Sequence, residues 1–235
     1  MMVTDFHSHI LPGIDDGSAS LEESIALLRM EAEQGVEHVV ATPHFYPNYQ
    51  SPEDFLEKRA RAEELLRQEM EKHEGLPRLS VGAEVYFFRG MSQSDCLKLL
   101  TIAQKSFILL EMPEYAWSDS MYCEIADIYS QQGITPIIAH VDRYLGFLRG
   151  KQIPQRLETL PVLVQANANF FLHRATAAKA CRMLQRGQIH LLGSDCHNLT
   201  SRTPNLKDAV DCIEKRMGND ALAWIYRHEA SVFSL

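Results

Sequence analysis

Short apolar runs, most of them followed by acids or histidines, recur along this chain of 235 residues. Seven runs are strand-like, and most are apolar on both faces, as buried parallel strands are: 2–6, 37–42, 79–86, 107–111, 135–140, 162–167 and 189–194. Helical patterns fall between them, near 20–34, 51–73, 118–132, 175–186, 206–217 and 219–228. This alternation predicts an α/β fold, a single distorted TIM-like (β/α)7 barrel that spans residues 1–235 as one domain. A doubly wound open sheet is the alternative, but it would collect functional residues at one switch point.

Six of the runs end in polar clusters, at 5–9, 42–44, 82–84, 110–113, 139–140 and 194–197. A parallel barrel gathers the carboxyl ends of its strands on one face, so these clusters are expected to converge on one pocket. The two-residue strand period turns His7 and His9 to the same side. Nine side chains are therefore candidate metal ligands: His7, His9, Asp16, His44, Glu84, Glu111, His140, Asp195 and His197.

Some of the candidates also have a structural alternative. His7 and His9 could form a structural pair, and Glu111 could belong to a buried salt bridge. Asp15 is assigned to a turn or a cap rather than to the metal, and both Asp15 and Asp16 could be turn residues. Mixed oxygen and nitrogen ligands without a thiolate favour Mn, Fe or Zn over a structural Cys-type zinc, and the ligands suffice for three ions. Cys196 lies between two ligands, and the strand period turns it away from them.

The net charge, the cysteines and the lengths of the apolar runs indicate which partners and which cellular location to expect. A net charge of −8 argues against a nucleic acid or an anionic membrane as the main partner. The five cysteines form no C-x-x-C pair, and we expect reduced thiols and a cytoplasmic location. No apolar run reaches 18 residues, so no membrane insertion is expected. The pattern leaves the oligomeric state open.

The order of the motifs is H-x-H, D-D-G, T-P-H, G-A-E, L-L-E-x-P, A-H-x-x-R-Y and S-D-x-H-N. This order resembles the polymerase and histidinol phosphatase (PHP) family of metal phosphoesterases. Residues 7–17 look like the bacterial manganese-dependent protein-tyrosine phosphatases of capsule and exopolysaccharide operons, and the matches run from residue 5 to about 206. The resemblance implies a (β/α)7 barrel with three metal ions, Mn²⁺ first and Fe or Zn as alternatives.

The resemblance also assigns roles to residues. It places His7, His9, Glu84 and Asp195 on one ion, Glu84, Glu111 and His140 on a second, and Asp16, His44 and His197 on the third. Arg143 and Arg202 match arginines on the phosphate side of the site. Guanidinium groups suit the non-bridging oxygens of a phosphate, although a surface charge is the alternative for each arginine.

The implied activity is hydrolysis of a phosphate monoester, with a metal-bridging hydroxide as the nucleophile. The expected substrate is phosphotyrosine in the tail of a bacterial tyrosine kinase of capsule or exopolysaccharide synthesis. A small-molecule phosphatase, such as one acting on histidinol phosphate, and a non-catalytic metal-binding module are the alternatives. Cys123, Cys181 and Cys212 lack an arginine six residues further on, which argues against a cysteine phosphatase built on any of these three.

Some residues bear on the shape of the substrate. Aromatic side chains near the expected site could stack on a phenyl ring, or could simply pack: Phe45, Tyr46, Tyr49, Phe87 and Phe88. The chain departs from the family pattern at Val141 and Asp142, where Pro-Glu is usual. It also departs at Phe170 and Phe171, which replace small residues. If these two phenylalanines line the pocket, the preferred substrate differs in shape.

Overall fold

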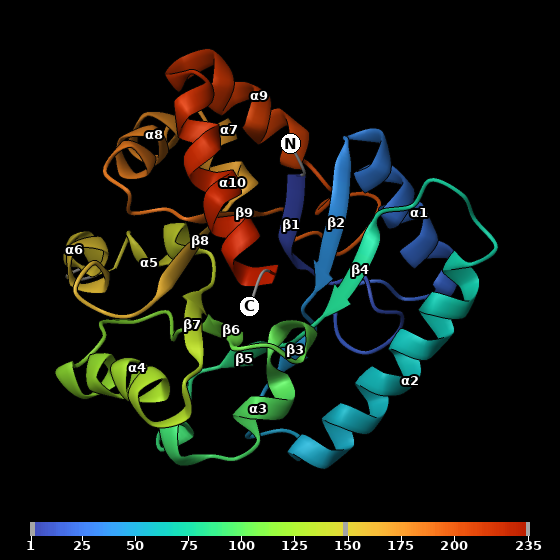
Figure 1. The fold of residues 1–235 in the computed structure, drawn as a ribbon, viewed down its shortest axis with the longest axis horizontal. Helices are drawn as coiled ribbons and strands as arrows, with labels where there is room; N and C mark the ends of the chain where they lie inside the picture. The colour runs from blue at the N-terminus through green and yellow to red at the C-terminus, as the bar shows by residue number, and fades with distance from the viewer. Residues whose placement is uncertain (1–2, 148–149, 234–235) are drawn as a thin grey trace.

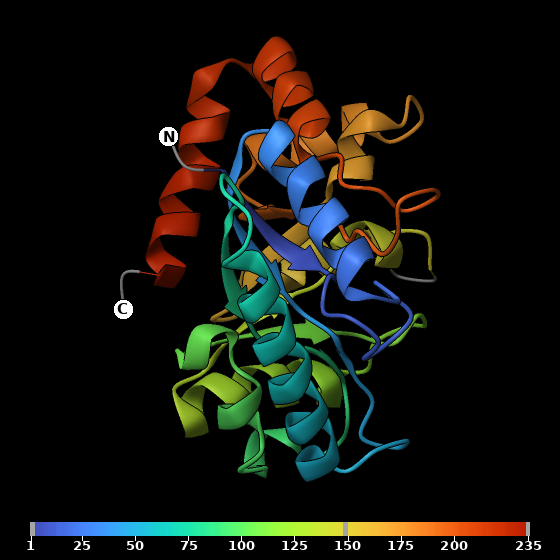
Figure 2. The same ribbon diagram turned by 90° about the vertical axis from the view of Figure 1, so that its right-hand side faces the viewer.

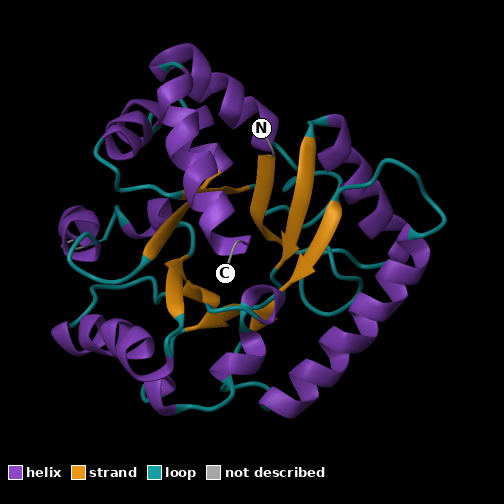
Figure 3. Cartoon of the chain, in the orientation of Figure 1, coloured by secondary structure: helices purple, strands orange, loops and turns teal. Residues whose placement is uncertain are grey.

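A computed structural model describes residues 3–147 and 150–233. Its strands are all parallel and ring a central core (Figure 1, Figure 3). One sheet has the order β1-β2-β4, built from Val3–Ser8, Val36–Ala41 and Arg78–Val81. The other has the order β3-β5-β6-β7-β8-β9, built from His44–Phe45, Glu84–Tyr86, Phe107–Glu111, Thr135–Ile138, Leu163–Asn167 and Leu191–Gly193. A parallel bridge between Ser8 and Cys196 joins the two sheets. The α/β, TIM-like arrangement of parallel strands is thus as predicted.

Two of the predicted strands are interrupted. The run near 37–42 is followed by a break at Thr42 and Pro43, after which the chain pairs again as β3. Proline has no N–H to donate to a ladder, which explains a break at this point. The run near 79–86 breaks at Gly82 and Ala83. A side chain at Gly82 would come within 2.9 Å of Ile102, so only glycine fits there.

Helices surround the strands (Figure 1). The longer ones are α1 (Leu21–Glu33), α2 (Pro52–Met70), α4 (Asp119–Gln132), α8 (Ala177–Gln185), α9 (Leu206–Met217) and α10 (Asn219–Phe233). Short helices are α3 (Leu97–Leu100), α5 (Val141–Tyr144), α6 (Ile153–Leu157) and α7 (Ala168–Leu172), with 3-10 turns at Met91–Gln93, Ile102–Gln104 and Gly150–Gln152. Ser20 caps α1 by accepting from Glu23 N at 3.3 Å, and Ser51 caps α2 by accepting from Asp54 N at 3.1 Å.

Two apolar clusters hold the fold together. The larger one packs strands against helices, and the smaller one fills the interior with residues such as Phe6, Leu109 and Leu191. Val232 of α10 belongs to the interior cluster, and Phe233 stacks on Phe6 with ring centroids 5.5 Å apart. Helix α10 lies on the side of the barrel where the chain begins (Figure 2). It therefore covers the amino-terminal end of the barrel and leaves the carboxyl ends of the strands for the polar clusters.

Candidate metal centre

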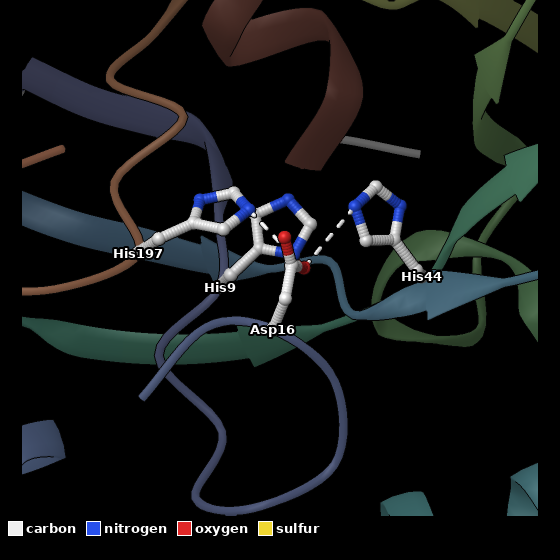
Figure 4. Close-up of side chains that lie close together, drawn as sticks. All are labelled: His9, Asp16, His44 and His197. Carbon is white, nitrogen blue, oxygen red and sulfur yellow. Dashed lines mark ion pairs between the residues drawn. The ribbon is translucent and has the colours of Figure 1, made fainter. Parts of the chain in front are cut away.

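All nine candidate ligands lie together at the carboxyl ends of the strands. Ligand atoms of four of them lie within 4.8 Å of one another (Figure 4): His9, Asp16, His44 and His197. Two further groups meet the same criterion, one of His7, His9 and Asp195 and the other of His44, Glu84 and Glu111. His140 joins them through Glu84. The groups share members, so they form one continuous cluster of acids and histidines.

Glu84 lies at the centre of this cluster. Its Oε2 atom is 3.0 Å from His44 Nδ1 and 3.1 Å from His7 Nε2. The same atom is 3.3 Å from His9 Nε2, and Oε1 is 2.8 Å from His140 Nε2. Burial raises the pKa of Glu84, but the charge of His7 and the hydrogen bond from His140 lower it well below its usual range. A fully buried carboxylate that faces four imidazoles is suited to bridge cations.

Several atoms of the cluster lack suitable protein partners. His7 Nε2 and His9 Nε2 face each other at 3.1 Å, and both point towards Asp195 Oδ1, at 3.5 and 3.6 Å. Glu111 Oε2 and His197 Nε2 are buried without a hydrogen-bond partner among the described residues. Buried polar atoms are normally satisfied. Lone pairs that converge without donors fit a site made to hold metal ions, and the donor set fits the metals predicted.

Asp16 completes the outer side of the cluster. Its side chain is 66% exposed, and its Oδ1 atom lies 3.5 Å from both His44 Nε2 and His197 Nε2 (Figure 4). Burial lowers the pKa of His197 to about 4, and the neighbouring His9 adds to this effect. A neutral His197 offers a lone pair near neutral pH. The exposed carboxylate and the two imidazoles therefore face a cation position that is open to solvent.

Asp15 has a larger role than the predicted turn. Its Oδ1 atom accepts from Gly17 N at 3.0 Å, as a turn residue would, but Oδ2 accepts from His9 Nδ1 at 2.8 Å and from His44 N at 3.0 Å. Burial lowers the pKa of His9, yet hydrogen bonds to Asp15 and Glu84 raise it to about 10. The Asp15 carboxylate thus fixes the ring orientation of His9 and presents Nε2 to the cluster. Its position beside Asp16 was the only sequence signal for this role.

Two polar residues of β8 support the cluster from inside the barrel. Gln165 Oε1 accepts from the backbone N–H of His140 at 2.6 Å and lies 3.4 Å from His7 Nδ1. Gln165 donates to Asn167, and Asn167 in turn donates to Asp195 Oδ2 at 2.9 Å. The sequence does not predict this role for Gln165. His140 and Asp195 both have positive φ, at 29° and 56°, a strained backbone that often marks functional sites.

The two candidate arginines reach the cluster from the solvent side. Arg143 Nη2 lies 2.5 Å from Asp195 Oδ2, and Arg202 Nη2 lies 2.6 Å from Asp195 Oδ1. Both side chains are about one-third exposed, at 32% and 37%. With Asn167 and Ser194 they line a cavity of about 300 Å³. Positive charge, amide groups and the metal cluster therefore meet in one small polar cavity.

The predictions on aromatic residues are corrected in part. Phe170 and Phe171 are 4% and 0% exposed, so they belong to the core and do not line the pocket. The short helix α7 turns them inwards. Phe45 is also buried, against Phe55, and cannot reach a substrate. Tyr46 does lie at the site, with its hydroxyl 3.2 Å from His44 Nδ1.

A second cavity, of about 320 Å³, lies beside Asp16 and has Tyr46 in its wall. Tyr49 packs edge-on against Tyr46 and is 87% exposed. Phe87 and Phe88 are partly buried against the core. At the other departure from the family pattern, Asp142 Oδ1 accepts from Asn167 N at 3.1 Å and so helps to place Asn167. Among the residues that the structure describes, no helix has the length and apolarity needed to cross a membrane.

Comparisons with known proteins agree with this geometry. The tyrosine-protein phosphatase CpsB of Streptococcus agalactiae is 29% identical over 227 residues, which cover 92% of this chain and 91% of CpsB. The tyrosine-protein phosphatase YwqE of Bacillus subtilis is 27% identical over 240 residues, covering 92% of this chain and 85% of YwqE. A solved structure, described as YwqE from Bacillus subtilis and CpsB from Streptococcus pneumoniae, unique metal-dependent tyrosine phosphatases, superposes with a TM-score of 0.84. It is 23% identical, and the match covers 98% of this chain and 94% of that one.

The predicted resemblance to capsule-operon proteins is thereby confirmed. The model of a family described as capsular polysaccharide synthesis, CpsB/CapC, matches residues 3–233. This match takes in every candidate ligand and both arginines. The chain belongs to the CpsB/CapC family of capsular polysaccharide synthesis proteins.

Proposed function

We propose that this chain is a metal-dependent phosphomonoester hydrolase that removes phosphate from phosphotyrosine in proteins. The observation that carries the proposal is a cluster of nine acids and histidines, with Glu84 at its centre, next to a cavity with two arginines. The named relatives, which are tyrosine-protein phosphatases, support it. A cluster of this size is more than core packing requires, because buried acids and histidines without partners destabilise a fold.

The cluster is proposed to hold three Mn²⁺ ions. One would be held by His7, His9, Glu84 and Asp195, a second by Glu84, Glu111 and His140, and the third by Asp16, His44 and His197. The facing nitrogens of His7 and His9 and the partnerless Glu111 Oε2 support these sets. Bound divalent ions would neutralise a phosphate dianion and activate water as the nucleophile near neutral pH.

The side chains of the chain itself would bind and orient the substrate. Arg143 and Arg202 present guanidinium groups to the same cavity, and such groups match phosphate oxygens in pairs. Asn167 holds Asp195 in place from behind at 2.9 Å. Tyr46, in the wall of the neighbouring cavity, offers a flat face to a phenyl ring. Together they would place a phosphate on the arginines and an aromatic ring beside Tyr46.

The proposed protein substrate is the phosphotyrosine-bearing tail of a bacterial tyrosine kinase of capsule or exopolysaccharide synthesis. The capsular description of the family supports this pathway. We also propose that the protein acts in the cytoplasm. Its five cysteines are all free, which suits a reducing compartment.

We also propose that the chain folds as a (β/α)7 barrel with seven strand–helix units and forms a single domain. If β2 with β3, and β4 with β5, are each one interrupted strand, the described strands reduce to seven. The bridge from Ser8 to Cys196 would then close the ring. A large apolar cluster that runs from Ile10 to Ile225 supports one domain over residues 1–235.

The test is phosphate release from a tyrosine-phosphorylated peptide, a serine-phosphorylated peptide and histidinol phosphate. Each is assayed with Mn²⁺ and again after chelation. We expect Mn²⁺-dependent release from the phosphotyrosine peptide, with little from the other two. Preference for histidinol phosphate would retain the site and replace the substrate. Release from none of the three, by protein with bound metal, would contradict the proposal and favour a non-catalytic module.

A further inference from the structure

A separate cavity of about 720 Å³ lies between α8, α9 and α10 and shares no lining residue with the metal centre. Four arginines line it: Arg182, Arg186, Arg216 and Arg227. Trp224 forms part of its wall, and Asp220 is its one acidic lining residue. We call this feature the arginine cavity.

The arginine cavity carries an excess of positive charge, with four arginines against one aspartate. The chain as a whole carries a net charge of −8, so a cluster of arginines is not a general property of its surface. The arginines for which an ion pair is found include Arg67, Arg143, Arg156 and Arg202, and none of these lines the cavity. Helix α8, which carries Arg182, contains no acid. Like charges that face one another without a counterion destabilise the folded state, and a bound anion would relieve this repulsion.

The aromatic wall of the cavity is held in a fixed position. Trp224 Nε1 donates to the backbone oxygen of Ile189 at 2.9 Å. Gly187 lies against the ring, because a Cβ atom there would be 3.2 Å from Trp224 Cζ2. The guanidinium carbon of Arg227 lies 5.7 Å from the ring centroid. His228 also packs against the ring, with centroids 4.4 Å apart, so the part of the indole that lines the cavity is a fixed apolar surface beside four guanidinium groups.

We propose that the arginine cavity binds a nucleoside di- or triphosphate, with the phosphates on the arginines and the base against Trp224. A volume of about 720 Å³ lies within the range of small-molecule sites, roughly 300–1,000 Å³. Guanidinium forks bind phosphate oxygens in pairs, and an indole face stacks on heteroaromatic rings. A simple inorganic anion would use the arginines and leave the aromatic wall without a partner.

The arginine cavity lies at the opposite end of the barrel from the metal centre. Arg186 and Gly187 precede β9 (Leu191–Gly193), whereas Asp195 and His197 follow it. Figure 2 shows α10, which carries Trp224 and Arg227, on the side where the chain begins. A nucleotide bound there would not compete with a phosphorylated substrate, so the site goes beyond the proposed phosphatase activity.

The test is a titration of the whole protein with ATP, ADP and pyrophosphate in metal-free buffer. Calorimetry and tryptophan fluorescence report binding, and Trp117 is only 7% exposed, so quenching reports Trp224. We expect saturable ATP binding with a Kd below about 1 mM. Arg182→Glu and Arg216→Glu should each raise that Kd at least about tenfold, and Arg216→Gln should raise it less. Arg61→Glu, on the exposed side of α2, changes the net charge equally and should leave the Kd unchanged.

The variant Arg143→Ala distinguishes ATP binding in the arginine cavity from ATP binding at the metal centre. Retained ATP binding in Arg143→Ala supports the arginine cavity, and lost binding would assign the nucleotide to the metal centre instead. Absence of saturation at several millimolar, or equal weakening by Arg61→Glu, would overturn the proposal. Pyrophosphate that binds as tightly as ATP would overturn the role of the base and Trp224.

Discussion

Replacing Asp15 by Asn tests whether the carboxylate behind His9 determines how tightly the centre holds metal. Asp15 accepts hydrogen bonds from His9 Nδ1 and His44 N on one oxygen and from Gly17 N on the other. An Asn side chain has one acceptor oxygen. Whichever way its amide lies, its NH₂ group faces an N–H donor, and the negative charge that favours His9 as a ligand is lost.

The expected magnitude follows from the environment of Asp15. Burial raises the pKa of Asp15, but the hydrogen bond and charge of His9 lower it to about 2, from an ordinary value of 3.8. This difference corresponds to roughly 2 kcal/mol of preference for the charged carboxylate, or several tens-fold in an equilibrium constant. Loss of a hydrogen-bond partner behind a metal-bound histidine typically costs about 10- to 100-fold in metal affinity. The two magnitudes agree, so we expect Mn²⁺ affinity to fall by about 10- to 60-fold.

Equilibrium dialysis against Mn²⁺, followed by metal analysis, measures this loss. Asp208→Asn is the matched control, because Asp208 is exposed in the first turn of α9 and undergoes the same change of charge. Circular dichroism checks that both variants fold. An Mn²⁺ Kd for Asp15→Asn within twofold of the unaltered protein would refute the reasoning.

Three further predictions follow from the site and the core. Arg143→Ala should lower kcat/KM on aryl phosphates by about 10²- to 10³-fold while metal content stays constant, and unaltered turnover would remove Arg143 from the mechanism. His140→Ala and Asp195→Ala should each lose metal together with activity, and a full metal complement by elemental analysis would contradict their place in the ligand set. Burial raises the pKa of Glu229 from 4.5 to about 8. Between these pH values the folded protein keeps a proton on Glu229 that the unfolded chain releases. The free energy of unfolding therefore falls as the pH rises from about 4.5 to about 8. Glu229→Gln should remove the part of this decline that Glu229 causes, a gain of up to about 5 kcal/mol at pH 8. Urea unfolding at pH 5 and pH 8.5 measures the change, and the same loss of stability between these pH values in both proteins would show that the idea is wrong.

The ligand positions could be predicted from sequence because each obeys a local rule. A short apolar run that ends in an acid or a histidine places that residue at a known end of a strand. The period of two also separates Cys196 from its neighbours Asp195 and His197. Cys196 is fully buried, and its Sγ lies 3.9 Å from Glu31 Oε1, on the side away from the ligands.

The supporting residues escaped prediction because their roles depend on distant partners. Gln165 acts through the backbone of His140 and the ring of His7, which is 158 positions away in sequence. Nothing in the sequence around Gln165 indicates that pairing. The sequence also leaves open whether Phe170 lines the pocket, for a related reason. Its position beyond β8 suggested the pocket, but α7 begins at Ala168 and turns the ring into the core.

Hydrogen bonds join the first strand to the segment after the last strand, and this has a consequence for protein synthesis. The Asp5 carboxylate accepts from Ser194 N at 2.9 Å across 189 positions, and His7 O accepts from Asp195 N at 2.8 Å. A ribosome that has made only the first half of the chain has released His7, His9 and Glu84, but not Asp195 or His197. The nascent chain therefore lacks the contacts that complete the centre until the last strand emerges. The proposed ligand set is therefore complete only after the last strand has paired with the first, near the end of synthesis.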